Sequence, residues 1–231
     1  MKIKITKDFR NQKAGWEYDF SKIKDFKFLT IVGNNGSGKS TILQTIRGSV
    51  PTKSKSLYEA DYKRLAENVE ITHDYENILF LDAVKDNGND FMNAYDAVGY
   101  FESGGFAKKN SSHGEGALID IARFMDTHKE ELKEKTLVVL DEVDNGLSTA
   151  NMVIFINFIY KLTLLEKCDV LVVSHNPFFI IQSILCYDIS KRKIISSSDY
   201  IKEVTGYEIK KIVTPEKKPN EKKERPRRKT D

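Results

Sequence analysis

The chain shows two hydrophobic patterns in turn, one with the two-residue period of strands and one with the spacing of helices. Residues 2–6 and 16–20 alternate apolar and polar side chains, so each segment predicts a strand, the first of them at the edge of a sheet. Four continuous apolar runs predict strands buried on both faces, and two short strands follow them. The runs are 28–32, 78–81, 137–140 and 170–173, and the short strands are 187–189 and 193–195.

Apolar residues at helical spacing lie between most of these strands. Ser148 stands where the N-cap of the longest predicted helix is expected, and Pro177 suits the first turn of another. Strands that alternate with helices predict an α/β fold with a mainly parallel sheet flanked by helices. The predicted helices are 42–47, 56–68, 91–101, 113–128, 148–166, 176–183 and 199–204.

The composition indicates one domain followed by a charged tail. The 231 residues are 40% hydrophobic, which is enough for one sizeable core. The net charge of +3 is uneven, because residues 215–231 hold eight Lys or Arg and four Asp or Glu. This basic tail has no large apolar residue, so we expect it to be disordered. It could bind nucleic acid through phosphate contacts, or it could be a solvated charged terminus.

The sequence favours a cytoplasmic protein. No run reaches the roughly 18 apolar residues of a membrane-spanning helix. The first residues have the pattern of a strand and not that of a signal peptide. Cys168 and Cys186 lie 18 residues apart without the spacing of metal ligands, as expected of reduced thiols in a cytosol.

The segment GNNGSGKST carries the strongest chemical signal, because it follows a strand, precedes a helix and has the G-x4-G-K-S spacing of a phosphate-binding loop. Its glycines let backbone N–H groups face an anion, and the helix N-terminus adds a positive field. Lys39 can reach the β- and γ-phosphates, and the Ser40 hydroxyl can bind Mg²⁺. A plain Gly-rich turn would leave the final Lys-Ser-Thr without a role. The residues expected to bind the nucleotide are Gly33, Asn34, Asn35, Gly36, Ser37, Gly38, Lys39, Ser40 and Thr41.

A second motif, LVVLDE, ends a predicted strand with two carboxylates, Asp141 and Glu142. This arrangement suits a site for a metal and a nucleotide. Asp141 would belong to the Mg²⁺ site, and Glu142 would position or deprotonate the attacking water. The alternative is a strand that leaves the core in an acidic turn. The phosphate-binding loop upstream favours the functional interpretation.

A third motif, VVSH, places His175 just after the predicted strand 170–173. His175 follows Asp141 by 34 residues, with one predicted helix and one strand between them. We therefore expect the two residues on adjacent strands, at the carboxyl edge where α/β sheets bind ligands. There His175 could contact the γ-phosphate, although a His in an ordinary loop is the simpler alternative.

A fourth motif, SSHGEG, opens the predicted helix 113–128. Its hydroxyl and backbone N–H groups, at Ser112, Gly114 and Glu115, could form a second anion site. The alternative is an N-cap with Glu115 in the first helical turn. This motif by itself does not distinguish the two.

The four motifs, in the order in which they occur along the chain, resemble those of the ATP-binding cassette (ABC) ATPases. The likeness covers nearly the whole chain except the tail. GNNGSGKST looks like their Walker A motif, LVVLDE like Walker B with its catalytic Glu, and VVSH like the switch-His loop. Residues 112–115 look like a variant of the signature Leu-Ser-Gly-Gly-Gln, and residues 144–148 fall where the D-loop sits.

The resemblance implies a P-loop ATPase domain over residues 1–214, with a short antiparallel N-terminal sheet and a small helical arm at about 51–112. It implies ATP and Mg²⁺ as cofactors and ATP hydrolysis that depends on Lys39, Glu142 and His175. It also implies a homodimer that sandwiches two ATP molecules head to tail, with Ser112 of one subunit touching the γ-phosphate bound by the other.

The chain departs from the family pattern at several points. His113 replaces the first signature Gly, and Ser148 stands where the D-loop usually has Asp. No Gln follows the strand 78–81, where the family contacts Mg²⁺, so Asp82 or Asp86 is the candidate for that place.

The sequence does not single out one aromatic residue that would stack on adenine. Trp16, Tyr18 and Phe20 could serve, although such residues more commonly pack in a core.

Only 73 residues separate Lys39 from Ser112, too few for the long coiled-coil arms of chromosome-maintenance and recombination-repair ATPases. The N-terminal layout and the signature nevertheless look more like those ATPases than like transporter subunits. We therefore expect a soluble, stand-alone ABC-type ATPase in a DNA-related, phage or defence process. The alternatives are the nucleotide-binding subunit of a membrane transporter and a nucleotide-gated binding module that hydrolyses slowly.

Overall fold

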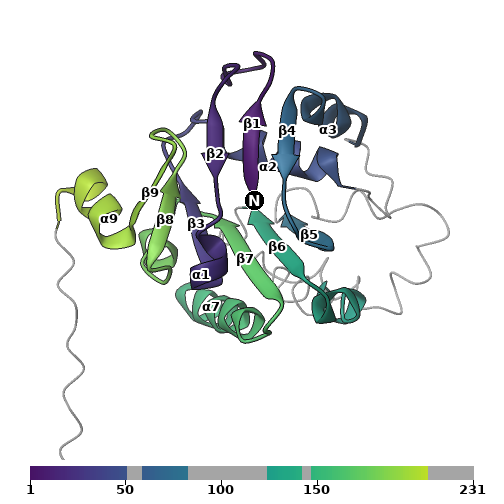
Figure 1. The fold of residues 1–231 in the computed structure, drawn as a ribbon. Helices are drawn as coiled ribbons and strands as arrows, with labels where there is room; N and C mark the ends of the chain where they lie inside the picture. The colour runs from purple at the N-terminus through teal and green to yellow at the C-terminus, as the bar shows by residue number, and fades with distance from the viewer. Residues whose placement is uncertain (51–58, 83–123, 142–146, 208–231) are drawn as a thin grey trace, which may run out of the picture.

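Two β-sheets form the centre of the fold, and helix α2 (Lys39–Ser49) lies between them (Figure 1). The computed structural model describes residues 1–50, 59–82, 124–141 and 147–207. The larger sheet has the strand order β5-β6-β7-β3-β8-β9, and the smaller sheet has the order β2-β1-β4. These two sheets confirm the predicted α/β fold with a mainly parallel sheet and a short antiparallel N-terminal sheet.

The smaller sheet is antiparallel throughout. Its strands are β1 (Lys2–Ile5), β2 (Glu17–Asp19) and β4 (Val69–Thr72). The prediction of an edge strand at residues 2–6 was wrong, because β4 pairs with the second side of β1. Strand β4 is not predicted from the sequence, since four residues with only two apolar side chains give a weak pattern.

The larger sheet is parallel from β5 to β8, and only β9 runs antiparallel to its neighbour. All six predicted strands are confirmed to within a few residues. They are β3 (Phe28–Val32), β5 (Asn77–Asp82), β6 (Thr136–Asp141), β7 (Cys168–Val173), β8 (Leu185–Asp188) and β9 (Lys193–Ser196).

The described helices lie where the sequence predicts them, apart from the short α1 and the 3-10 turn η1, which were not predicted. Ser148 caps α7 by accepting a hydrogen bond from the Asn151 amide, and Pro177 opens α8, as expected. The predicted helix 113–128 is seen at residues 124–127, and the predicted helix 91–101 lies outside the described residues. The helices are α1 (Ile23–Phe26), α2 (Lys39–Ser49), α3 (Glu59–Ala66), the 3-10 turn η1 (Glu131–Lys133), α7 (Thr149–Thr163), α8 (Pro177–Ile180) and α9 (Ser197–Thr205).

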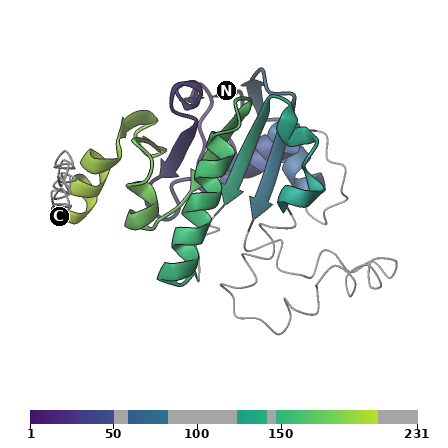
Figure 2. The same cartoon turned by 90° about the horizontal axis from the view of Figure 1, so that it is seen from below.

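The two faces of the larger sheet bury different partners (Figure 2). Leu137 and Val139 of β6 face α2 and the smaller sheet, in one apolar cluster. Val138 and Leu140 face α7, in a second cluster on the opposite side. Because successive side chains of a strand point to opposite faces, a strand covered on both sides is apolar throughout.

Helix α3 packs against α2 without space for a side chain between them. A Cβ added to Gly48 would lie 1.9 Å from the Tyr62 carbonyl oxygen. The Arg47 guanidinium lies over the rings of Tyr62 and Phe80, at 5.6 and 5.5 Å from their centroids. Residues 59–82 of the predicted arm therefore belong to the body, as α3, β4 and β5. The rest of that arm lies outside the described residues, so the domain and arm boundaries stay predictions.

In the part of the chain that the structure describes, no helix has both the length and the apolar character needed to cross a bilayer.

Cys168 and Cys186 are free thiols, and both are buried. Burial raises the pKa of each thiol to about 12, because the thiolate loses its hydration. The native protein should therefore react slowly with a thiol reagent at mildly alkaline pH, whereas both thiols should react at once in guanidinium chloride. Absorbance of the released reagent anion measures the rate. A fast thiol in the folded protein would contradict this environment.

Candidate functional site

The loop of residues 33–41 joins β3 to α2 and curls back on itself. Gly33, Gly36 and Gly38 have φ values of 145°, 76° and 99°, which residues with a side chain rarely adopt. A Cβ at Gly33 would also lie 2.8 Å from the Ser37 hydroxyl oxygen. The loop conformation therefore requires the glycine spacing from which it was predicted.

Lys39 lies in the interior of this loop. Its ammonium donates hydrogen bonds to the carbonyl oxygens of Gly33 (2.9 Å) and Asn34 (3.0 Å), and its side chain is buried. The N-cap of α2 is Gly38, so no side chain accepts from the first amides of the helix. An ammonium beside these amides makes a site for an anion.

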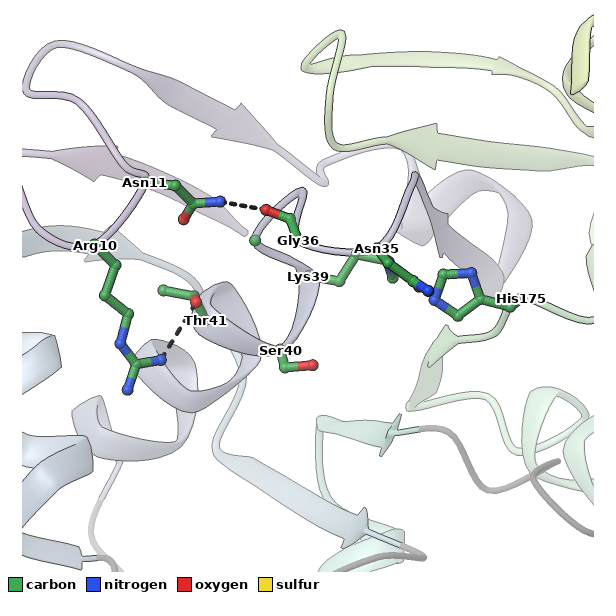
Figure 3. Close-up of a pocket in the computed structure, with 9 residues that line it drawn as sticks. Arg10, Asn11, Asn35, Gly36, Lys39, Ser40, Thr41 and His175 are labelled. Atoms are coloured by element: carbon green, nitrogen blue, oxygen red, sulfur yellow. Dashed lines mark hydrogen bonds between the residues drawn. The ribbon is translucent and has the colours of Figure 1, made fainter.

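A pocket of about 400 Å³ opens beside the loop (Figure 3). Six of the nine predicted nucleotide-binding loop residues line it, together with His175 and two residues of the β1–β2 connection. In Figure 3, Asn35 and His175 point toward one another. The lining residues are Arg10, Asn11, Asn35, Gly36, Gly38, Lys39, Ser40, Thr41 and His175.

The strand order brings Asp141 and His175 toward the loop. Strands β6, β7 and β3 are consecutive in the sheet, so their carboxyl ends lie within roughly 10 Å of one another. Asp141 pairs in register with Val173, and His175 follows two residues later. The expectation that Asp141 and His175 come from adjacent strands is therefore confirmed.

Asp141 lies against the face of α2 that carries Gln44. Asp141 lines a small cavity with Gln44, which lies one helical turn after Ser40. A hydroxyl and a carboxylate are oxygen ligands of the kind that Mg²⁺ prefers. Among the described residues, no three His, Cys, Asp or Glu side chains gather as a metal site. A magnesium ion here would thus need phosphate and water oxygens as further ligands, as it usually does in nucleotide sites.

Several predicted residues lie outside the described residues. They are Glu142 and the signature residues Ser112, Gly114 and Glu115, so their roles stay predictions. Of the two candidates for the missing Gln, Asp86 is also outside. Asp82 ends β5 in register with Asp141 of the neighbouring strand.

Sequence reasoning missed the contribution of Arg10 and Asn11, in the connection between β1 and β2. The Arg10 guanidinium donates to the hydroxyl of Thr41 (3.3 Å) and to the Gln44 amide oxygen (3.0 Å). The Asn11 amide donates to the Gly36 carbonyl oxygen at 2.6 Å. Their only sequence signal is a polar loop between two strands, which is common on any surface.

The three aromatic candidates for adenine stacking do not line the pocket. Tyr18 and Phe20 are buried in the core, where the Phe20 and Tyr187 ring centroids are 4.6 Å apart. Trp16 is partly buried, and the Arg192 guanidinium lies 4.2 Å from the centroid of its ring. The alternative of core packing is thus confirmed for Tyr18 and Phe20.

Comparisons with known proteins agree with this geometry. A family model described as "ABC transporter" matches residues 20–145, more than half of the chain. The zinc import ATP-binding protein ZnuC of Wigglesworthia glossinidia brevipalpis is 27% identical over 209 residues, which cover 82% of this chain and 86% of that protein.

Solved structures show a weaker similarity. A nucleotide-free ATP-binding cassette from an ABC transporter matches with 17% identity, a TM-score of 0.49, and coverage of 89% of this chain and 94% of that one. A dimeric ATP-binding cassette in a post-hydrolysis state with ADP and Pi matches with 16% identity, a TM-score of 0.49, and coverage of 85% and 98%. With the family model spanning the phosphate-binding loop and Asp141, the chain belongs to the ABC transporter family, as an ATPase domain.

Proposed function

We propose that this chain is the ATP-hydrolysing subunit of a membrane transporter. One observation carries the proposal: the pocket brings Lys39, Ser40 and His175 together, beside the strand that ends in Asp141. A relative named as an ATP-binding protein of zinc import supports the transporter alternative over the expected stand-alone, DNA-related ATPase. None of the reported relatives supports a nucleic-acid partner for the basic tail.

The phosphates of ATP would occupy the inside of the loop. The Lys39 ammonium would exchange the Gly33 and Asn34 carbonyl oxygens for oxygens of the β- and γ-phosphates. The amides at the start of α2 would donate to the same phosphates, since the Gly38 N-cap has no side chain to accept from them. The remaining loop residues, Asn35, Gly36, Ser37 and Gly38, would complete the cradle with backbone groups, and the Thr41 amide belongs to the start of α2.

The Ser40 hydroxyl and the Asp141 carboxylate would hold Mg²⁺, which neutralises charge on the phosphates when it is bound. The position of Asp141 beside Gln44, one helical turn after Ser40, supports this pairing. Glu142 would accept a proton from the attacking water, since it follows Asp141 directly at the end of β6. His175 would donate a hydrogen bond to the γ-phosphate from the opposite wall of the pocket.

A second copy of the chain would close the pocket. Ser112, Gly114 and Glu115 of that copy would cover the γ-phosphate. Such closure excludes water and strengthens each electrostatic contact with the phosphates. ATP-driven closure of the dimer would be the movement that the membrane partner uses.

Replacing Lys39 by Ala should weaken the binding of Mg-ATP by about 10- to 100-fold, the usual effect of losing a hydrogen bond to a charged group. Isothermal titration calorimetry measures this affinity. Lys22→Ala is the matched control, because Lys22 is exposed and pairs with Asp25 on α1. Equal affinities for the Lys39→Ala variant and the parent protein would overturn the site.

Replacing Glu142 by Gln should slow ATP hydrolysis by about 100-fold or more, because the water loses its base. The variant should accumulate as an ATP-bound dimer, with doubled mass in light scattering. A phosphate-release assay gives the rate. A monomer at saturating Mg-ATP would contradict the sandwich, and a parental hydrolysis rate would contradict the role of Glu142.

As a transporter subunit, the chain should sediment with the membranes of the cells from which it comes. Because no described helix could cross a bilayer, alkaline carbonate should then release it from those membranes. Immunoblots of the two fractions measure the distribution. Recovery of the protein entirely in the supernatant before carbonate treatment would favour the stand-alone interpretation instead.

A further inference from the structure

Three side chains link the core of the smaller sheet to the tip of the phosphate-binding loop. We propose that Asn11, Gln12 and Tyr18 form a positioning chain that holds the Gly36 carbonyl away from the phosphates and thereby sets the affinity for nucleotide. Asn11 lines the nucleotide pocket, whereas Gln12 and Tyr18 do not and act on the loop tip only through Asn11. The inference rests on the proposed function, because it assumes that the loop binds phosphate.

Consecutive hydrogen bonds connect the members of the positioning chain. The Tyr18 hydroxyl donates to the side-chain oxygen of Gln12. The Gln12 amide nitrogen donates to the side-chain oxygen of Asn11 at 2.9 Å. The Asn11 amide nitrogen donates to the Gly36 carbonyl oxygen at 2.6 Å, as Figure 3 shows. The three hydrogen bonds therefore form an unbroken series from the core to the loop.

The inner end of the chain is held firmly. Tyr18 is 1% exposed and Gln12 is 0% exposed. Burial raises the pKa of Tyr18 to about 12, so its hydroxyl keeps the proton that it donates to Gln12. The backbone of Gln12 is fixed as well, because it exchanges hydrogen bonds with Phe9 at 2.8 and 3.1 Å. Asn11 at the outer end is exposed, so its position depends on this support.

The loop needs this support because an anion must meet N–H groups and not carbonyl oxygens. Lys39 engages the carbonyl oxygens of Gly33 and Asn34. The Gly36 carbonyl instead accepts from Asn11, which lies on the β1–β2 connection. A Cβ at Gly36 would meet nothing within 4 Å, so no packing on that side of the residue fixes its peptide. The Asn11 hydrogen bond supplies that restraint.

Gln12 also packs on the start of α2. A Cβ added to Gly38 would lie 2.2 Å from the Gln12 amide nitrogen, so the amide occupies the space of a side chain at Gly38. Gly38 is the N-cap of α2. Gln12 thus supports both the tip of the loop, through Asn11, and the beginning of the helix whose amides face the anion.

Loss of this support should weaken nucleotide binding without slowing the chemical step. The loop holds the phosphates in the ground state and in the transition state alike, so a looser loop weakens both equally. Such a change raises KM and leaves kcat unaltered. Losing one neutral hydrogen bond should raise KM about three- to tenfold. Asn11→Asp should raise it further, because the carboxylate would face the Gly36 carbonyl.

The test compares Asn11→Ala, Asn11→Asp and Tyr18→Phe with the parent protein. The measurements are kcat and KM for Mg-ATP hydrolysis and the melting temperature of each variant. Asn11 is exposed, so its variants should fold and melt like the parent; Tyr18→Phe keeps the buried ring and removes only the hydroxyl. Lys13→Ala is the matched control, since Lys13 is on the same connection but pairs with Asp8.

A raised KM at parental kcat for both Asn11 variants and for Tyr18→Phe, with Lys13→Ala unchanged, would support the positioning chain. A parental KM for both Asn11 variants would overturn it, as would a fall in kcat alone. A parental KM for Tyr18→Phe beside a raised KM for the Asn11 variants would also overturn it, because Asn11 would then act by itself. If the proposed function itself is wrong, the result is different, because the parent protein would then neither bind nor hydrolyse Mg-ATP.

Discussion

An anion can bind at the start of α2 only if the loop turns its N–H groups toward the anion and its carbonyl oxygens away from it. Asn11 engages the Gly36 carbonyl, while Lys39 engages the carbonyls of Gly33 and Asn34, which it would exchange for phosphate oxygens when the nucleotide binds. The glycines permit this conformation, but they do not choose it, because glycine is free to adopt many others. The choice comes from side chains that reach the loop from its interior and from a neighbouring sheet.

Helix α2 holds this loop in place because it is enclosed between the two sheets. One side of α2 packs on the larger sheet and another on the smaller sheet, while α3 contacts it through the bare backbone at Gly48. The order of β6, β7 and β3 then determines which side chains reach the phosphates. A parallel sheet gathers the carboxyl ends of its strands at one edge, so Asp141 and His175 come to the loop from distant parts of the sequence.

Membership of the ABC transporter family changes the functional interpretation more than it changes the site. The motifs predict a phosphate site, and the structure brings the described ones to one edge of the sheet. The choice between a stand-alone ATPase and a transporter subunit depends, in the sequence, on the N-terminal layout, the signature and a missing Gln. Those features tell little about a partner, because a partner is recognised by surfaces and not by the phosphate chemistry that the motifs encode.

Local hydrophobic period and glycine spacing are enough to predict the strands of the larger sheet, the longer described helices and the phosphate-binding loop. The other features depend on how the elements pack together. This packing placed β1 in the middle of its sheet by pairing it with β4, and it sent Tyr18 to the core. It also brought Arg10 and Asn11 against α2 and the loop. These outcomes depend on contacts between residues far apart in the chain, which leave no periodic signal in the local sequence.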